Sequence, residues 1–136
     1  MTQHEALRVL IYSDDRDVRQ AVIAALGVRP HPDLPPFEYV EVATEPVVWQ
    51  HLDSSRGRPD LVILDGEAVP AGGLGIARQM KDEIFQAPPV LVLTGRPQDA
   101  WLATWSRAEA AVSHPIEPMR LAEVVIDLAR GVLTPG

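Results

Sequence analysis

The chain has 136 residues, 46% of them hydrophobic and none of them cysteine, so we expect one domain over residues 1–136, without disulfides or thiolate chemistry. Nineteen acidic against twelve basic side chains give a net charge of −7, which argues against direct binding to nucleic acid. No apolar stretch is long enough to cross a membrane and no signal peptide is visible, so we expect a cytoplasmic protein whose partners are proteins or small cations.

Strand and helix patterns alternate along the whole chain. Short runs of Leu, Val and Ile predict strands buried on both faces, and apolar residues three and four apart predict amphipathic helices. In chain order the expected elements are strand 7–12, helix 15–26, strand 37–43, helix 45–53, strand 59–65, helix 74–84, strand 89–93, helix 97–107, strand 109–112 and a helix from residue 118. This alternation predicts an α/β fold with a five-stranded parallel sheet, in the flavodoxin-like order 2-1-3-4-5, and helices on both faces.

Turn and capping residues mark the boundaries of these elements. Ser13 or Asp14 is the expected N-cap of the first helix, and Gly27 is expected at its end. Thr44 can cap the second helix. Residues 28–36 contain four of the thirteen prolines and predict a long, partly polyproline-like loop.

Two tryptophans, Trp101 and Trp105, lie one helical turn apart. We expect both to pack at least partly against the core. Two such large side chains are difficult to bury completely on one helix, so a partner surface that includes one of them is a further hypothesis.

Polar residues follow the predicted strands at the sheet edge where ligands bind in such folds. Asp14 and Asp15 come after the first strand, and Asp65 ends the third. Carboxylates about 4 Å apart repel each other by roughly 4 kcal/mol per pair, so the cluster is expected to bind a cation or to take up a proton. Oxygen ligands of this kind suit Mg²⁺. Thr94 and His114 end the fourth and fifth strands. A hydroxyl and an imidazole then face a carboxylate, as phosphoryl transfer to Asp65 would need.

These features together resemble the receiver domains of bacterial response regulators over about residues 7–133. The resemblance rests on the acidic pair after the first strand, on Asp65 in LVILDG, on Thr94 in VLVLTG and on His114 in SHP. It implies a stand-alone receiver in phosphorelay, or two-component, signalling. In such a receiver Asp65 is the phosphoacceptor, Thr94 contacts the phosphoryl group, and His114 stands where the family has lysine.

The resemblance also implies a metal site and partners. Asp14, Asp15, Asp65 and the backbone carbonyl of Glu67 would bind Mg²⁺, and the phosphoryl group would come from a sensor histidine kinase or a phosphotransfer protein. We expect no enzymatic activity. Since the chain ends at Gly136, we expect no output domain. The signal would pass to a downstream protein through the face made by the fourth helix, fifth strand and fifth helix, which is also a candidate homodimer interface.

Several positions depart from the family pattern. His114 replaces lysine, and an imidazole is shorter and mostly uncharged near pH 7. The aromatic residue expected three positions earlier is Ala111. The proline expected four residues after Asp65 is Pro70, five residues after it, and the loop at 28–36 is additional. These departures support a second hypothesis, a pseudo-receiver that acts as a protein-interaction module independently of phosphorylation.

Other interpretations stay open at this point. The only role of Asp14 or Asp15 could be to cap the first helix. Asp65 could be a turn residue before Gly66, and His114 could be a structural histidine. A flavin or nucleotide binder would need Ser, Thr or Gly after the first strand, whereas this loop is acidic. A haloacid-dehalogenase-like phosphatase would need a second Asp two residues after Asp65.

Overall fold

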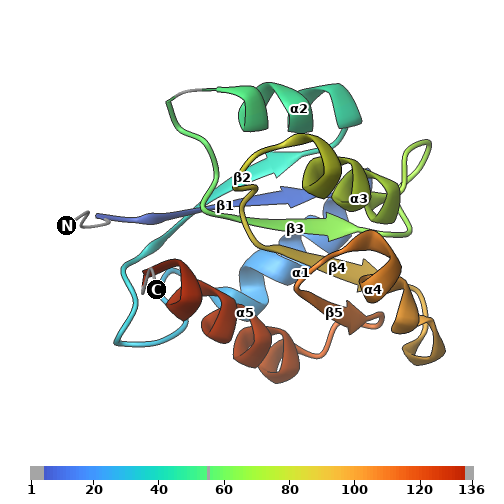
Figure 1. Ribbon diagram of the computed structural model, residues 1–136. Coiled ribbons are helices and arrows are strands. Elements are labelled where there is room, and N and C mark those ends of the chain that lie inside the picture. Colours follow the sequence, from blue (N-terminus) through green and yellow to red (C-terminus); the bar gives the residue numbers. More distant parts are fainter. Residues whose placement is uncertain (1–4, 55, 134–136) are drawn as a thin grey trace.

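The computed structural model describes residues 5–54 and 56–133, and these residues form a five-stranded parallel sheet in the order β2-β1-β3-β4-β5 (Figure 1). The predicted fold class and strand order are confirmed. The strands are β1 (Leu7–Tyr12), β2 (Phe37–Val42), β3 (Leu61–Asp65), β4 (Val90–Thr94) and β5 (Ala110–Ser113).

Helices cover both faces of the sheet (Figure 1). On one face α1 (Arg16–Leu26) and α5 (Pro118–Leu133) contact each other. The other face carries α2 (Glu45–Asp53), α3 (Gly73–Glu83) and the short α4 (Trp101–Ser106). Within the described residues, no helix has the length and apolar character that a membrane span requires.

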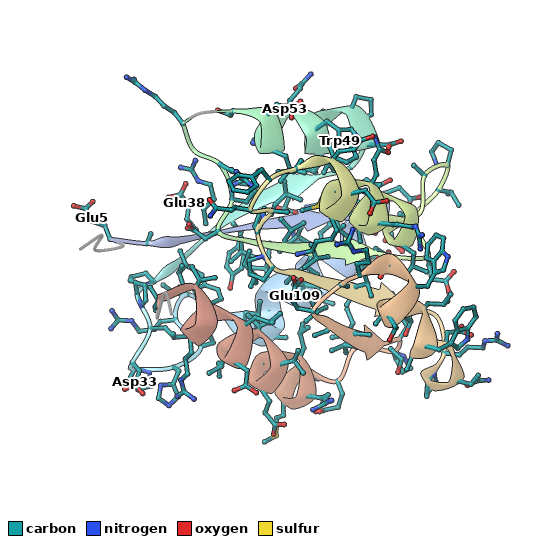
Figure 2. The ribbon with its side chains drawn as sticks, in the orientation of Figure 1. Glu5, Asp33, Glu38, Trp49, Asp53 and Glu109 are labelled. Atoms are coloured by element: carbon teal, nitrogen blue, oxygen red, sulfur yellow. The ribbon has the colours of Figure 1, made fainter. Side chains whose placement is uncertain are left out.

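Two apolar layers hold the sheet between these helices, because successive strand side chains point to opposite faces. Ile11 and Ile63 pack toward α1 and α5, whereas Leu10 and Leu64 pack toward α2 and α3. In Figure 2 side chains fill the space between sheet and helices, while the exposed Asp53 lies on the outer helix layer. Every residue of β3 is buried, which confirms it as the central strand.

The loop over residues 28–36 is anchored to the core by Leu34. This side chain is 2% exposed and belongs to the layer that includes α1 and α5. Backbone hydrogen bonds from Leu34 N to His31 O (3.0 Å) and from Phe37 N to Val28 O (2.7 Å) close the loop. The additional segment is therefore part of the fold.

The predicted helix at 97–107 is wrong in extent. A short 3₁₀ turn (Pro97–Asp99) comes first, closed by hydrogen bonds from Asp99 N to Arg96 O and from Ala100 N to Pro97 O. The helix α4 then ends at Arg107, whose φ of 63° is left-handed. Trp101 and Trp105 are 65% and 45% exposed, so neither is a buried core residue.

The N-cap of the first helix is neither Ser13 nor Asp14 but the other aspartate that was considered as a helix cap. Asp15 is the N-cap, since its Oδ1 accepts a hydrogen bond from Asp17 N at 2.8 Å. Ser13 and Asp14 are engaged elsewhere, as described below. Gly27 ends α1 with a φ of 66°, as predicted. Thr44 lies at the N-cap position of α2 without a side-chain hydrogen bond to that helix.

Candidate functional site

A pocket of about 420 Å³ opens at the carboxyl end of the sheet, beside the end of β3. The residues lining it come from the ends of several strands: Asp14, Asp15, Val18, Asp65, Glu67, Gly95 and His114. Five of these seven residues, all except Val18 and Gly95, were predicted from the sequence as site residues. Thr94 is the predicted site residue that does not line this pocket.

Asp65 lies at the base of the pocket and is 2% exposed. Its Oδ2 accepts a hydrogen bond from Ser13 Oγ at 2.7 Å. Its Oδ1 accepts one from Glu67 N at 2.9 Å, and His114 Nε2 lies 3.3 Å from the same oxygen. A buried carboxylate is costly unless donors surround it, and here each oxygen has at least one.

Ser13 is the contributor that the sequence pattern did not identify as a site residue. It directly follows β1 and is completely buried, and its Oγ accepts a hydrogen bond from Asp15 N at 3.1 Å. A polar residue immediately after a buried strand was the available signal. That signal was interpreted as helix capping, a role that Asp15 fills instead.

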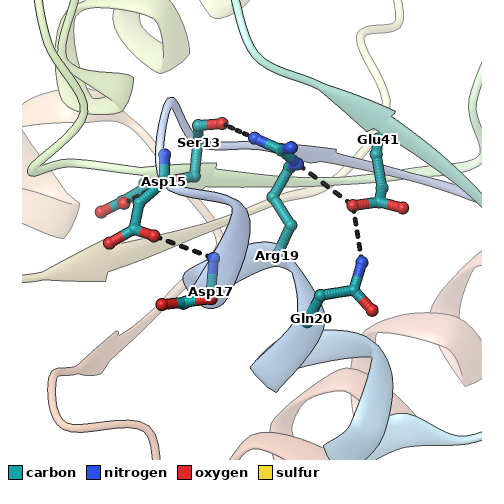
Figure 3. A network of polar contacts seen from close by, with 7 residues as sticks. Ser13, Asp15, Asp17, Arg19, Gln20 and Glu41 are labelled. Carbon is teal, nitrogen blue, oxygen red and sulfur yellow. Dashed lines mark hydrogen bonds and ion pairs between the residues drawn. The ribbon is translucent and has the colours of Figure 1, made fainter.

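The two aspartates of the acidic pair make different contacts. Asp14 Oδ1 accepts a hydrogen bond from Val69 N at 3.1 Å, so it contacts the loop after β3. Asp15 caps α1 through Asp17 N. Figure 3 shows this turn together with Arg19, which donates to the carbonyl of Ser13 and to Glu41. Both aspartates line the pocket while also fixing local structure.

The loop after β3 is held against the end of β1 at a second point as well. The Tyr12 hydroxyl donates a hydrogen bond to Ala71 O. Burial, followed by the negative charges of Glu45, Asp14 and Asp65, raises the pKa of Tyr12. A neutral phenol, which can donate this hydrogen bond, is thus favoured beside the acidic pocket.

Thr94 ends β4 at the same sheet edge, but its side chain lines a neighbouring hollow of about 210 Å³ together with Ala111. Its Oγ1 lies 3.4 Å from Arg96 O, a long and weak hydrogen bond. The backbones of the two strand ends are joined by the hydrogen bond from His114 N to Thr94 O at 2.8 Å. Thr94 is therefore next to the pocket without facing it.

The Glu67 side chain lies across Gly95 at the mouth of the pocket. A Cβ atom at position 95 would come within 1.7 Å of Glu67 Oε1, so any larger residue there would displace this carboxylate. Four acidic residues thus line the pocket: Asp14, Asp15, Asp65 and Glu67. Such an arrangement favours a bound cation or an incoming group that brings one.

Among the residues that the structure describes, no group of three or more His, Asp or Glu side chains is arranged to hold a metal ion. Mg²⁺ does not need three such side chains, because it commonly binds one or two carboxylates and keeps several waters. Asp14 and Asp65 line the same pocket and offer two carboxylates of this kind. The residues present therefore fit a weakly held Mg²⁺ better than a tightly caged ion.

Solved structures share this fold over nearly the whole chain. A signal receiver domain from Vibrio parahaemolyticus matches with a TM-score of 0.75 and 21% identity, over 94% of this chain and 93% of the other. The BeF3-activated DrrB receiver domain matches with a TM-score of 0.69 and 17% identity, over 92% and 98%. This chain thus has the fold of these receiver domains.

Two curated proteins, from Mycobacterium tuberculosis strains CDC 1551 / Oshkosh and H37Rv, are each 60% identical to this chain over 125 residues. The match covers 92% of this chain and 92% of each relative, and both relatives are named uncharacterized response regulatory proteins. The protein-family models give no match. This chain belongs to the response regulatory proteins of two-component systems.

Proposed function

We propose that Asp65 accepts a phosphoryl group and that the chain works as a receiver in a phosphorelay. The buried Asp65 carboxylate supports this most directly, because its Oδ1 is contacted by two residues of an acidic pocket while Ser13 holds its Oδ2. In the transfer, Oδ1 forms the bond to phosphorus as the bond between phosphorus and the donor breaks. The electron pair of the broken bond leaves with the donor.

The charge of the incoming group must be offset in this acidic pocket. Mg²⁺, held by Asp14, Asp65 and the carbonyl of Glu67, would supply positive charge to the phosphoryl oxygens. Asp15 already caps α1 by accepting a hydrogen bond from Asp17 N, so we propose a smaller part for it in holding the ion. His114 Nε2, already 3.3 Å from Asp65 Oδ1, would donate to a phosphoryl oxygen.

Thr94 would have to turn to contact the phosphoryl group, since its side chain lines the neighbouring hollow. Such a turn would break only the weak hydrogen bond from Thr94 Oγ1 to Arg96 O, so its cost in free energy is small. The same turn would change the hollow that Thr94 shares with Ala111 of β5.

The partners that this function requires are a sensor histidine kinase or a phosphotransfer protein and a downstream protein. The face made by α4, β5 and α5 is our candidate for the downstream contact or for a homodimer, because it carries exposed apolar side chains. These are Trp101, Trp105 and Met119. No catalytic turnover of another substrate is part of this function.

A second function, a phosphorylation-independent interaction module, is favoured by one observation. Ala111 leaves a hollow beside Thr94, so a movement of Thr94 has no large side chain to push. In this case Asp65 would serve only to hold the loop after β3 through Glu67 N.

Incubation with acetyl phosphate and Mg²⁺ followed by intact-protein mass spectrometry separates the two functions. We expect a mass increase of one phosphoryl group in the wild type and none in Asp65→Asn. Asp53→Asn, which changes an exposed carboxylate of α2, is the matched control and should behave like the wild type. An unlabelled wild type, with beryllofluoride also failing to bind, would reject the phosphoacceptor role in favour of the interaction module.

A further inference from the structure

Ser13 has a partner for each of its polar groups, and together these hold it firmly. Its backbone N donates to Val42 O at 3.1 Å, and its carbonyl accepts from Arg19 Nη1 at 2.6 Å. Its hydroxyl lies between Asp15 N and Asp65 Oδ2. The residue is completely buried at the carboxyl end of β1, next to β3.

The hydroxyl has one proton, and its direction follows from the neighbours. Asp15 N can only donate, so at 3.1 Å it uses an acceptor lone pair of Ser13 Oγ. The carboxylate of Asp65 can only accept, so at 2.7 Å the hydroxyl proton points to Oδ2. A hydrogen bond from a hydroxyl to an ionised carboxylate is among the stronger kinds in proteins.

We propose that Ser13 is a positioning residue for phosphoacceptor Asp65, an inference that rests on the proposed function. By holding Oδ2, it fixes the plane of the carboxylate and leaves Oδ1 next to Glu67 N and His114 Nε2, where the bond to phosphorus forms. A hydroxyl does this without adding another negative charge to the pocket, which is already lined by four acidic residues.

With acetyl phosphate as the donor, Oδ1 bonds to phosphorus as the phosphorus–oxygen bond to acetate breaks, and acetate leaves with the electron pair. No proton moves in this step. Its rate therefore depends on how well Oδ1 is aligned with phosphorus, and loss of alignment typically lowers rates by about tenfold to a hundredfold.

The first experiment measures the rate of phosphorylation by acetyl phosphate in the full chain. We expect Ser13→Ala to be slower by about tenfold or more and Ser13→Thr, which keeps the hydroxyl, to recover most of the rate. Ser106→Ala is the matched control, because it removes another fully buried hydroxyl, one that bonds to Ala103 O within α4. Equal rates in the wild type and Ser13→Ala would overturn the proposal.

The second experiment does not depend on phosphorylation. If Ser13 orients Asp65, Ser13→Ala should weaken the hydrogen bond from Glu67 N to Oδ1, so the Glu67 amide proton resonance should shift upfield and exchange faster in NMR spectra. Ser106→Ala should leave this resonance in place. An unchanged Glu67 amide in Ser13→Ala would overturn the positioning role even if the wild type takes up no phosphoryl group, a result that would count against the proposed function alone.

Discussion

His114 and Asp65 are the pair of residues on which the chemistry of the pocket depends most. The imidazole is partly buried and lies 3.3 Å from a nearly buried carboxylate oxygen. An imidazole reaches less far than a lysine ammonium, which is a fixed point charge on a long side chain. His114 can therefore donate to a phosphoryl oxygen but offsets its charge less completely.

Two substitutions of His114 should change the phosphorylation rate in opposite directions. We expect His114→Ala to lower the rate with acetyl phosphate by about tenfold or more at pH 8, because a donor to the phosphoryl group is lost. His114→Lys should raise it, because an ammonium stays charged there. His51→Ala, in α2 and outside the pocket, should match the wild type. If His114→Ala were as fast as the wild type, His114 would have no role as a donor.

The sequence predicted the place of these site residues better than their orientations. Asp65 and His114 were expected at one edge because each follows a buried strand, and both line the pocket. The hydrogen bond from Ser13 to Asp65 and the position of Thr94 at a neighbouring hollow depend on side-chain rotamers. Rotamers are decided by neighbours on other strands, which spacing along one strand does not encode.

Among the elements, the strands with uninterrupted apolar runs were predicted best. The run at Leu7–Tyr12 agrees with β1 at both ends, and the LVIL run lies within β3. The region after β4 was predicted worst, because a proline and a left-handed Arg107 divide it into short turns. A short helix has few periodic positions, so its ends are set by local hydrogen bonds that the sequence pattern leaves undetermined.

The loop over residues 28–36 behaves as a part of the core through one side chain. Leu34 is 2% exposed, so Leu34→Ala should lower the free energy of unfolding by about 2–4 kcal/mol. Val28 is an exposed residue of the same loop, and Val28→Ala should change that free energy by less than about 0.5 kcal/mol. Urea unfolding followed by circular dichroism measures both. Equal effects of the two variants would mean that the loop is not anchored by Leu34.

At the scale of the whole molecule, the alternation of strands and helices was enough to predict the sheet order. Parallel strands need crossover connections, and short connections of one hand leave few arrangements. The observed order β2-β1-β3-β4-β5 brings the ends of β1 and β3 together, where Tyr12 pairs with Leu64. This pairing is why Asp14 and Asp65 share a pocket although they lie far apart in the sequence.

Tyr39 links the edge strand β2 of this sheet to the helix layer, and its ionisation lowers the stability of the fold at alkaline pH. Its hydroxyl donates to Gly27 O at the end of α1, and its ring meets Phe37 edge to face at 6.1 Å. Burial raises the pKa of Tyr39 to about 12, whereas an unfolded tyrosine has a pKa of about 10. The neutral phenol is thus favoured by the folded state.

Because the folded pKa is the higher one, the contribution of Tyr39 to stability is fully present below about pH 10 and is lost as the pH rises to about 12. A shift of this size corresponds to at most about 2.7 kcal/mol, and partial solvent exposure of the ring reduces the expected loss to about 1–2 kcal/mol. Tyr39→Phe cannot ionise, so its free energy of unfolding should fall less steeply over this range than that of the wild type. Urea unfolding at about pH 9 and about pH 11.5, at constant ionic strength, gives the two slopes. Parallel declines in the two proteins would show that Tyr39 titrates alike in the folded and unfolded chains.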